Sequence, residues 1–328
     1  MHERSQVDRY RSLPMQVIRG TADCVRPPEG SAVTIGVFDG VHLGHQLLIG
    51  DARRLAAELG ARSTVVTFDR HPAAVVRPES APLLLTDLEH RIELLAATGV
   101  EATQIITFDE ERSKEEAEDF VLEVLVGCLG TRAVIVGDDF HFGHDRKGDV
   151  ALLRRMGAEH GFEVDGIPLM ASSTAAAPVS STAIRRALQA GDLAAANRML
   201  GRPHEIRGTV HTGDGRAREL GMRTANIHLP MRLQLPADGV YAGWHVRASG
   251  DVHPAVISVG RRPTFYEEGG ELLVESHLMD FDGDLYGEAA AVRFTDVVRL
   301  GQIAFESMDA LADQMQRDLA GAREALGV

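Results

Sequence analysis

The segment from Thr34 to Ile49 constrains the fold more than any other part of the chain. It begins as a short apolar run, breaks at Asp39 and Gly40, and resumes as a helical pattern of apolar residues. This order predicts a buried strand that ends in a tight turn, and the turn opens a helix. Backbone N–H groups and the positive end of the helix dipole would then face a ligand above the strand, which suits phosphate oxygens.

Two histidines lie in this turn, with His42 and His45 on either side of Gly44. Imidazole groups there would stabilise the charge that develops on a transferred phosphate. The alternative is a surface turn that two histidines and a glycine merely close, and the motif alone favours neither interpretation. The choice therefore depends on what the rest of the chain places beside the turn.

Strands and helices alternate through the first half of the chain. The later expected strands are Ser63–Phe68, Gln104–Phe108, Arg132–Val136 and Phe162–Pro168, and the expected helices are Leu47–Gly60, Asp87–Thr98, Lys114–Leu129 and Val150–His160. Such alternation with short connections is typical of an α/β fold, in which helices cover both faces of a parallel sheet. Ligands of these sheets bind beyond the carboxyl ends of the strands.

Two polar clusters follow strands of this sheet and are expected at the same edge as the first turn. One is Thr67–Pro72 and the other is Gly137–Gly143. The aspartates of the second cluster would most often just hydrogen-bond within an ordinary loop. Phe140 and Phe142 favour a functional interpretation, because two aromatic rings just outside a strand form a wall for a planar ligand.

A third cluster, Val179–Arg186, opens another predicted helix. Ser180 or Ser181 would cap that helix, and capping alone explains both serines. It does not explain Arg185, because a cation at a helix N-terminus opposes the dipole unless an anion binds there. This conflict favours a phosphate site.

Length and composition exclude several classes of protein. With 328 residues the chain suits two domains. The 48 acidic against 34 basic residues, a formal net charge of -14, argue against non-specific nucleic-acid binding. Cys24 and Cys128 lie far apart in sequence, which argues against a disulfide framework and a zinc site and favours a reducing cytosol. Residues 1–14 are expected to form a loose tail, not a signal peptide or membrane anchor.

The periodicity changes after residue 201, where a domain boundary is expected. The predicted division is a tail at 1–14, a first domain at 15–201 and a second at 202–328. The second domain is expected to form short strands at Glu205–Val210, Thr224–Leu229, Gly239–Arg247, His253–Val259, Glu271–Leu278 and Leu285–Phe294. This spacing predicts a small antiparallel β-barrel, closed by an amphipathic helix at Ser307–Leu326.

A glycine-rich passage lies near the start of this second domain. Gly208, Gly213 and Gly221 precede Thr224 and Asn226. Glycines let the backbone approach phosphate closely, and Thr and Asn offer neutral oxygen ligands for Mg²⁺ that is held jointly with ATP. The alternative is an ordinary glycine-rich hairpin, which the residues by themselves favour.

One strand of the second domain carries a candidate base. Alternation puts Val274 and Leu278 on one face and Glu275 with His277 on the other. A solvated strand glutamate is the commoner case. The alternative makes Glu275 the general base for a hydroxyl that attacks a γ-phosphate.

The motifs of the first half recur in a known family. They are, in order, Gly36-x-Phe38-Asp39-Gly40-x-His42-x-Gly44-His45, Thr67-Phe68 with His71-Pro72, Gly137-x-Asp139-Phe140-x-Phe142-Gly143, and Ser180-Ser181-Thr182-x-Ile184-Arg185. Together they resemble the adenylyltransferase module of bacterial bifunctional riboflavin kinase/FMN adenylyltransferases, also called FAD synthetases. The resemblance implies a Rossmann-like nucleotidyltransferase domain that joins FMN to the AMP part of ATP and releases pyrophosphate.

The resemblance also implies roles for individual residues. His42 and His45 would contact the ATP phosphates, and Arg185 would act with them by holding the outer phosphates. Further contacts to ATP are expected from Gly36, Phe38, Asp39, Gly40, Gly44, Ser181 and Thr182. Contacts to the flavin are expected from Phe68, His71, Asp139, Phe140 and Phe142.

The second half is similar to the riboflavin kinase module of the same family. The matching motifs are Gly208 to Asn226, Gly239-Val240-Tyr241, Ser258-Val259-Gly260-x-x-Pro263-Thr264-Phe265, Val274-Glu275-x-His277 and Asp280-Phe281-x-x-Asp284-Leu285-Tyr286-Gly287. The resemblance implies that Thr224 and Asn226 bind Mg²⁺ with ATP and that Glu275 is the base for the ribityl 5′-hydroxyl. Gly208, Gly213 and Gly221 would approach the ATP phosphates.

Four residues depart from the family pattern. Arg70 and Arg223 stand where the family usually has Pro, and Ala217 stands where Gly is common. Arg299 is displaced by one position from the usual Arg near the closing helix. Since the metal ligands and the base are kept, the expected kinase activity is weakened or retuned.

The sequence thus predicts a bifunctional enzyme that converts riboflavin to FMN and FMN to FAD. Its expected partners are ATP with Mg²⁺, riboflavin and FMN, without nucleic acid or membrane, in a cytoplasmic monomer or weak homo-oligomer. One alternative is an FMN adenylyltransferase whose barrel only binds flavin. Another is a catalytically silent flavin sensor, which His42, His45 and Arg185 disfavour because binding alone needs no residues for pyrophosphate.

Overall fold

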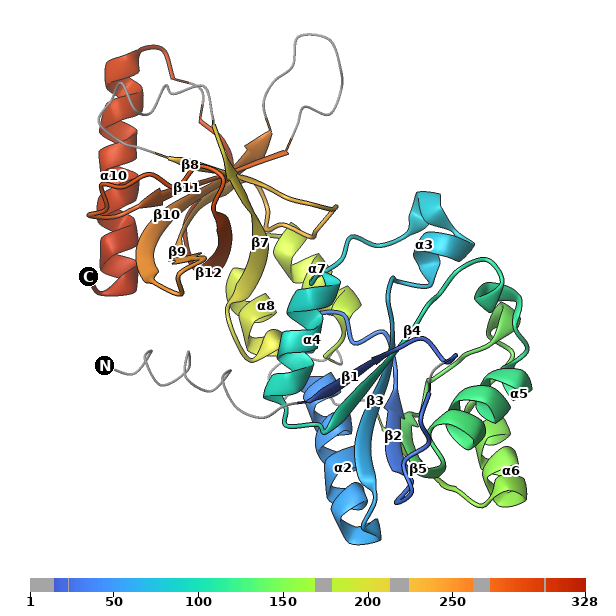
Figure 1. The fold of residues 1–328 in the computed structure, drawn as a ribbon. Coiled ribbons are helices and arrows are strands. Elements are labelled where there is room, and N and C mark those ends of the chain that lie inside the picture. The colour runs from blue at the N-terminus through green and yellow to red at the C-terminus, as the bar shows by residue number, and fades with distance from the viewer. Residues whose placement is uncertain (1–14, 23, 169–178, 213–223, 262–271, 304) are drawn as a thin grey trace. The chain divides into compact units, whose positions relative to one another are not determined.

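The computed structural model describes residues 15–22, 24–168, 179–212, 224–261, 272–303 and 305–328 (Figure 1). The chain forms two compact units that divide between Ser180 and Ser181, whereas the predicted domain boundary lies after residue 201. Of the two helices between these positions, Leu193–Leu200 packs on strands of the second unit, and Ser181–Gln189 packs on that helix. Within the described residues, no helix is both long and apolar enough to cross a membrane.

The first unit is built on a six-stranded parallel sheet in the order β1-β4-β3-β2-β5-β6. Its strands are β1 (Gln16–Arg19), β2 (Ser31–Ile35), β3 (Arg62–Phe68), β4 (Ala102–Ile106), β5 (Thr131–Gly137) and β6 (Glu163–Ile167). Its α-helices are α2 (Leu43–Leu59), α3 (Ala73–Val76), α4 (Leu88–Ala97), α5 (Ala117–Phe120) and α6 (Val150–His160). Short 3₁₀ turns occupy Pro78–Ser80, Arg112–Lys114 and His144–Arg146.

Helices cover both faces of this sheet, as the sequence predicts (Figure 1). Helices α2 and α4 pack over one face, where Ile49 and Leu95 join the buried cluster with Val65 of β3. Helix α6 covers the other face, where Leu153 packs with Val134 of β5. The chain runs from β2 to β3 and β4 on one side of β2, and to β5 and β6 on the other. The carboxyl end of β2 is therefore a topological switch point, the usual place for a ligand in such sheets.

The helix predicted at Lys114–Leu129 is irregular. It consists of α5 followed by a π-helical segment at Val121–Cys128, at whose end the N–H of Leu129 donates to the carbonyl of Val124, five residues back. This wider winding buries Val121, Val124, Leu125 and Cys128 in the core. Hydrophobic periodicity predicts that a helix is present but does not distinguish the π form from the α form.

The expectation that the two cysteines form no disulfide is wrong, so they give no support for a reducing cytosol. Cys24 and Cys128 form a disulfide, with Cα atoms 5.5 Å apart, within the usual range for such a bond. Cys24 lies before β2, and Cys128 ends the π-helical segment just before β5, the strand beside β2. Sequence separation misled the prediction because neighbouring strands of a parallel sheet come from distant parts of the chain.

Reducing this disulfide is expected to destabilise the first unit. The two cysteines are 104 residues apart, and a cross-link of that span restricts the unfolded chain by about 5 kcal/mol in the chain-entropy estimate. Calorimetry with and without dithiothreitol should show a melting temperature that is about 10 °C lower in the reduced protein. The Cys24→Ser variant should have the melting temperature of the reduced protein, and dithiothreitol should not change it. Equal melting temperatures for oxidised and reduced wild type would contradict this expectation.

The second unit is a closed antiparallel barrel in the order β10-β11-β8-β7-β12-β9. Its strands are β7 (His204–His211), β8 (Ala225–His228), β9 (Gly239–Arg247), β10 (Val252–Arg261), β11 (Leu272–Leu278) and β12 (Ala289–Leu300). Its helices are α7 (Ser181–Gln189), α8 (Leu193–Leu200) and α10 (Met308–Leu326). The predicted barrel with a closing helix is confirmed. The last strand begins later than expected, because residues 284–288 form a turn that the N–H of Glu288 closes on the carbonyl of Leu285.

Helix α10 packs against the outside of the barrel (Figure 1). Ala322 is buried there with Val240 and Val256. Arg299 of β12 donates its Nε–H to both carboxylate oxygens of Asp318 on this helix, each at 3.1 Å. The displaced arginine therefore fastens the closing helix to the barrel.

Two histidines of the barrel are fully buried. Burial lowers the pKa of both His204 and His245 to about 4. The Nε2 atom of His204 contacts the carbonyl of Gln234 at 2.8 Å, and the Nδ1 atom of His245 contacts the hydroxyl of Ser276 at 3.1 Å. Both imidazoles are therefore held neutral at physiological pH.

Stability should decrease in mild acid for this reason. The folded pKa values lie below the ordinary value of about 6.5, so the unfolded chain binds more protons once the pH falls below that value. This contribution is complete above about pH 6.5 and is lost towards about pH 4, at a cost of up to about 3 kcal/mol per histidine. Urea unfolding at about pH 7.5 and about pH 5 measures it.

A matched pair of variants isolates the contribution of His245. Asparagine at 245 does not titrate and still offers a hydrogen-bonding group to Ser276, so His245→Asn should lose less stability between the two pH values than wild type. The control variant His228→Gln changes an exposed histidine and should leave the pH dependence of stability as in wild type. An unchanged pH dependence in both variants would refute the assignment to His245.

Candidate active sites

The turn between β2 and α2 has an unusual backbone. Phe38, Gly40 and Val41 have φ angles of 52°, 82° and 37°. Left-handed backbone is strained for Phe and especially for the β-branched Val. Such strain persists only where surrounding contacts impose it, and it is common at ligand sites.

Asp39 provides much of that constraint. Its buried carboxylate accepts hydrogen bonds from the N–H groups of Leu85 at 3.0 Å and Thr86 at 3.1 Å. The N–H of Gly40 donates to the hydroxyl of Thr86 at 3.1 Å. Asp39 was predicted to contact ATP, but these contacts point its carboxylate at protein donors. We therefore interpret Asp39 as the residue that shapes the turn.

His42 and His45 lie together at the start of α2. His42 caps the helix, because its Nδ1 atom accepts the N–H of His45 at 3.3 Å. The two imidazoles stack with centroids 3.6 Å apart and planes at 18°, and the ring of Phe38 meets His45 edge-on at 5.0 Å. A Cβ atom on Gly44 would lie 3.3 Å from the ring of His42, so glycine keeps this turn open. The predicted combination of a histidine pair with a helix N-terminus is present.

The loop after β3 lies beside this turn, because β3 is the neighbour of β2 in the sheet. The ring of Phe68 packs edge-on against Phe108, with centroids 5.4 Å apart. Asp69 accepts the N–H of Phe108 at 2.9 Å, and the Nδ1 atom of His71 accepts the N–H of Ala73 at 3.1 Å. The flavin-side candidates Phe68 and His71 are half-buried at the carboxyl edge of the sheet.

The loop after β5, on the other side of β2, carries three more candidates. Asp139 is exposed, and the half-buried ring of Phe140 stacks on Phe142 with centroids 5.4 Å apart. Phe142 is only 9% exposed and belongs to the hydrophobic core beside Phe120. Core packing thus accounts for Phe142, and Phe140 is the better candidate for the wall of a planar-ligand site.

Ser181 and Thr182 open α7, where the sequence predicts a helix start, and Arg185 follows one turn later. The side chains of Ser181 and Arg185 are half-buried, and that of Thr182 is exposed. By its contacts α7 belongs to the second unit. That these residues meet the His42 turn stays a prediction.

The candidate kinase residues meet across two strands of the barrel. Glu275 of β11 lies directly opposite Asn226 of β8. Directly opposite side chains share one face of a sheet, with Cβ atoms about 5 Å apart. Val274 and Leu278 are buried, while Glu275 and His277 are half-buried, so the predicted alternation of faces is confirmed.

Neighbouring strands extend this polar row. Ser258 of β10 lies opposite Glu275, and His211 of β7 lies opposite Asn226. Thr224 is half-buried immediately before β8. A Cβ atom on Gly208 would collide with the carbonyl of His228, so close approach of β7 and β8 explains that glycine. Gly213 and Gly221, like the departures at 217 and 223, lie outside the described residues.

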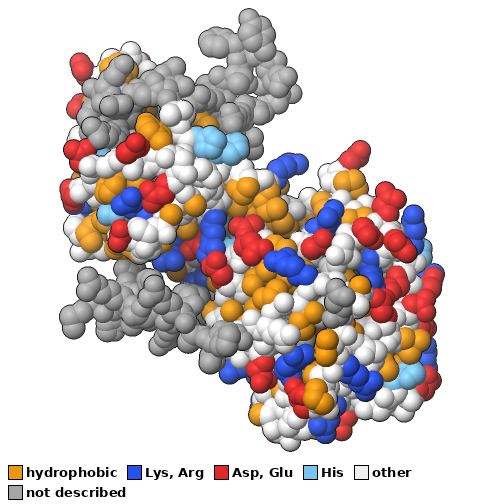
Figure 2. Space-filling view, viewed as in Figure 1, with side chains coloured by type: hydrophobic (Ala, Val, Ile, Leu, Met, Phe, Trp, Pro, Cys, Tyr) orange, Lys and Arg blue, Asp and Glu red, His pale blue; other side chains and the backbone are white. Residues whose placement is uncertain are grey.

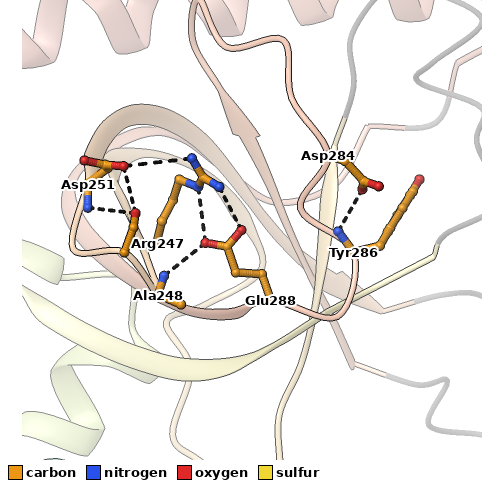
Figure 3. Close-up of polar contacts among 7 residues, drawn as sticks. Arg247, Ala248, Asp251, Asp284, Tyr286 and Glu288 are labelled. Carbon is orange, nitrogen blue, oxygen red and sulfur yellow. Dashed lines mark hydrogen bonds and ion pairs between the residues drawn. The ribbon is translucent and has the colours of Figure 1, made fainter.

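The loop between β11 and β12 is fixed by contacts that sequence reasoning missed (Figure 3). Arg247 forms an ion pair with Glu288, with nitrogen–oxygen distances of 3.2 and 3.1 Å. The N–H of Ala248 donates to the same carboxylate at 3.1 Å. The guanidinium of Arg247 also lies 5.1 Å from the ring centroid of Phe281. Such pairing across an irregular loop has no sequence period to reveal it.

A second missed residue lies behind the His42 turn. Arg91 of α4 is 4% exposed and donates to the carbonyls of Val37 at 2.7 Å and Phe68 at 2.6 Å. Burial lowers its pKa from the ordinary value. A signal was present in the sequence, because Arg91 precedes the apolar Leu94 and Leu95 by three and four residues and so shares their helix face.

Comparisons with known proteins identify the family. The family model for FAD synthetase matches residues 25–183, and the model for riboflavin kinase matches residues 200–326. The bifunctional riboflavin kinase/FMN adenylyltransferase of Pseudomonas fluorescens is 40% identical over 309 residues, which cover 94% of this chain and 97% of that protein. The chain belongs to this bifunctional family. The family member from Escherichia coli K12 is 36% identical over 316 residues and covers 96% of this chain and 99% of its own.

A solved structure from Streptococcus pneumoniae has the family fold but carries the name macrolide-efflux protein. It aligns with a TM-score of 0.83 at 30% identity, covering 94% of this chain and 99% of its own. Both family models and the curated relatives instead name flavin enzymes. The predicted family resemblance is confirmed.

Proposed function

We propose that this protein phosphorylates riboflavin to FMN with ATP, and then joins FMN to the AMP part of a second ATP to form FAD and pyrophosphate. The observation that carries the proposal is that each unit holds a paired site of its own. The first unit has the stacked His42 and His45 at a helix N-terminus. The second has Glu275 directly opposite Asn226.

Adenylyl transfer needs no protein nucleophile. A phosphate oxygen of FMN attacks the α-phosphorus of ATP, the bond from that phosphorus to the β-phosphate oxygen breaks, and pyrophosphate leaves. The protein must align the two phosphates and neutralise their charge. His42, His45 and the N–H groups at the start of α2 would bind the phosphates near the reacting centre. Ser181, Thr182 and Arg185 would hold the outer phosphates that leave.

The kinase step needs a base and a metal. The ribityl 5′-hydroxyl of riboflavin attacks the γ-phosphorus, its proton passes to the carboxylate of Glu275, and ADP leaves. Thr224 and Asn226 would hold Mg²⁺ together with ATP, and the ion would supply charge neutralisation. Within the described residues there is no cluster of three or more His, Cys, Asp or Glu placed to hold a metal.

The two activities are proposed to divide along the chain as the sequence suggests, with adenylyl transfer in 15–201 and the kinase in 202–328. The family models, at 25–183 and 200–326, support this division. The proposed substrates are small molecules. The enzyme is proposed to be a cytoplasmic monomer or weak homo-oligomer. The net charge of -14 argues against a nucleic-acid partner. So does the face in Figure 2, where basic and acidic side chains are interspersed.

A second candidate function keeps only adenylyl transfer and leaves the barrel as a flavin-binding module. Arg223 and Ala217, which depart from the family pattern within the glycine-rich motif, favour it. Arg299 does not, because its ion pair with Asp318 gives it a structural role.

Supplying the purified protein with ATP and Mg²⁺, and with either riboflavin or FMN, separates the two candidates by chromatography of the products. The proposal expects FMN and FAD from riboflavin, and FAD from FMN. Formation of FAD from FMN with no product from riboflavin would support the second candidate instead.

A further inference from the structure

Arg91 links the two loops that flank the proposed adenylyl-transfer centre. Val37, whose carbonyl accepts one of its hydrogen bonds at 2.7 Å, directly precedes the strained residues of the phosphate turn. Phe68, whose carbonyl accepts the other at 2.6 Å, opens the loop that leads to His71. The hydroxyl of Thr67 also donates to the carbonyl of Val37 at 3.1 Å. One side chain of α4 thus sets the separation between the ends of β2 and β3.

A buried cation at this position lowers the stability of the fold unless its interactions compensate for the loss of hydration. Burial disfavours its charged form, and among the described residues Arg91 makes no ion pair within 4.0 Å. Asp39, Asp69 and Asp87 act on it only through longer-range attraction. An apolar residue would continue the buried face of α4 that Leu94 and Leu95 form. A planar guanidinium, in contrast, presents two donors in a fixed geometry and can hold two carbonyls at once.

The strained turn needs support on both of its sides. Asp39 fastens it to Leu85 and Thr86. On the other side Arg91 and Thr67 hold the carbonyl of Val37, immediately before the first left-handed residue. Without Arg91 the carbonyls of the half-buried Val37 and Phe68 each lose a charged donor. The turn that carries His42 would then be free to shift relative to the flavin-side loop.

We propose that Arg91 is a positioning residue for adenylyl transfer, which holds the phosphate turn and the flavin-side loop in register. The inference rests on the proposed function of the first unit. Arg91 acts through the backbone of Val37 and Phe68 and has no assigned contact with substrate. Its effect should therefore fall mainly on turnover, because a displacement of about 1 Å near a reacting centre can reduce the rate about 100-fold.

The test compares three variants in the full chain. Arg91→Met removes the charge and both donors at similar length, and Arg91→Lys keeps the charge but cannot hold both carbonyls in the same geometry. Arg54→Met is the matched control, since Arg54 is an exposed arginine of α2 that pairs with Glu58. For each, kcat and KM of FMN adenylylation are measured well below the melting temperature. Riboflavin phosphorylation by the same preparation is the internal control.

The expected result is a fall of about 100-fold in kcat of adenylylation for Arg91→Met, with a smaller fall for Arg91→Lys and none for Arg54→Met. KM for ATP and FMN should change much less, and phosphorylation of riboflavin should stay as in wild type. Wild-type kcat in folded Arg91→Met, or equal loss of both activities, would overturn the inference. If Arg91→Met does not fold, wild-type kcat in Arg91→Lys overturns it. Absence of adenylylation in wild type would refute the proposed function itself, which is a distinct outcome.

Discussion

Replacing His42 by alanine is expected to abolish FAD formation from FMN and to leave FMN formation from riboflavin intact. The imidazole of His42 stacks on His45 at the N-terminus of α2, where the proposal places the ATP phosphates. Loss of one group that stabilises developing charge typically costs about 100- to 1000-fold in rate. The kinase residues belong to the other unit, so their activity should not respond. Chromatography of products from FMN and from riboflavin measures both activities in one preparation.

His42 also caps α2, and a second variant separates the two roles. Loss of a cap costs about 1 kcal/mol, which weakens the helix without unfolding a domain. Asparagine is a good N-cap residue but has no imidazole, so His42→Asn should restore the melting temperature and remain inactive in adenylylation. Recovery of FAD formation in His42→Asn would show that capping, and not phosphate contact, is what the histidine supplies.

Glu275→Gln is expected to give the reverse pattern, with no FMN from riboflavin and normal FAD from supplied FMN. Glutamine has nearly the same size but cannot accept a proton, and loss of a general base costs about 100- to 10,000-fold. Glu275 lies opposite Asn226, so it is adjacent to the proposed metal ligand. Its half-buried side chain is on the outer face of β11, away from the barrel core, so the substitution should leave the core intact.

Mixing the two single variants provides the control. His42→Ala should supply FMN, and Glu275→Gln should convert that FMN to FAD, so the mixture should form FAD from riboflavin although neither variant does so alone. Equal loss of both activities in either single variant would argue against two independent sites.

The architecture was predictable from the sequence wherever hydrophobic periodicity and turn residues determine the local structure. The strand, turn and helix around His42 and the short strands of the barrel follow from hydrophobic period and turn residues. The edge strand β1 was missed, because its four residues are too few to show a period. The disulfide and the ion pair of Arg247 with Glu288 were missed because each joins residues distant in sequence.

The candidate sites were predictable to the level of the sheet edge and the strand face. Parallel strands carry their loops at one edge, so the clusters after β2, β3 and β5 could be expected together. The roles within each cluster depend on packing. Asp39 accepts hydrogen bonds from Leu85 and Thr86, about 46 residues away. Phe142 packs in the core beside Phe120. No local pattern reports such contacts.

The fate of the ATP phosphates tests the central proposal most directly. Riboflavin is incubated with the wild-type protein and Mg²⁺, once with ATP labelled at the γ-phosphate and once with ATP labelled at the α-phosphate, and the FAD is isolated. Two activities in one chain predict label in FAD from both, at equal molar amounts, since the γ-phosphate becomes the FMN phosphate and the α-phosphate enters with AMP. No FAD from riboflavin, or FAD that carries the α-label without the γ-label, would contradict the proposal.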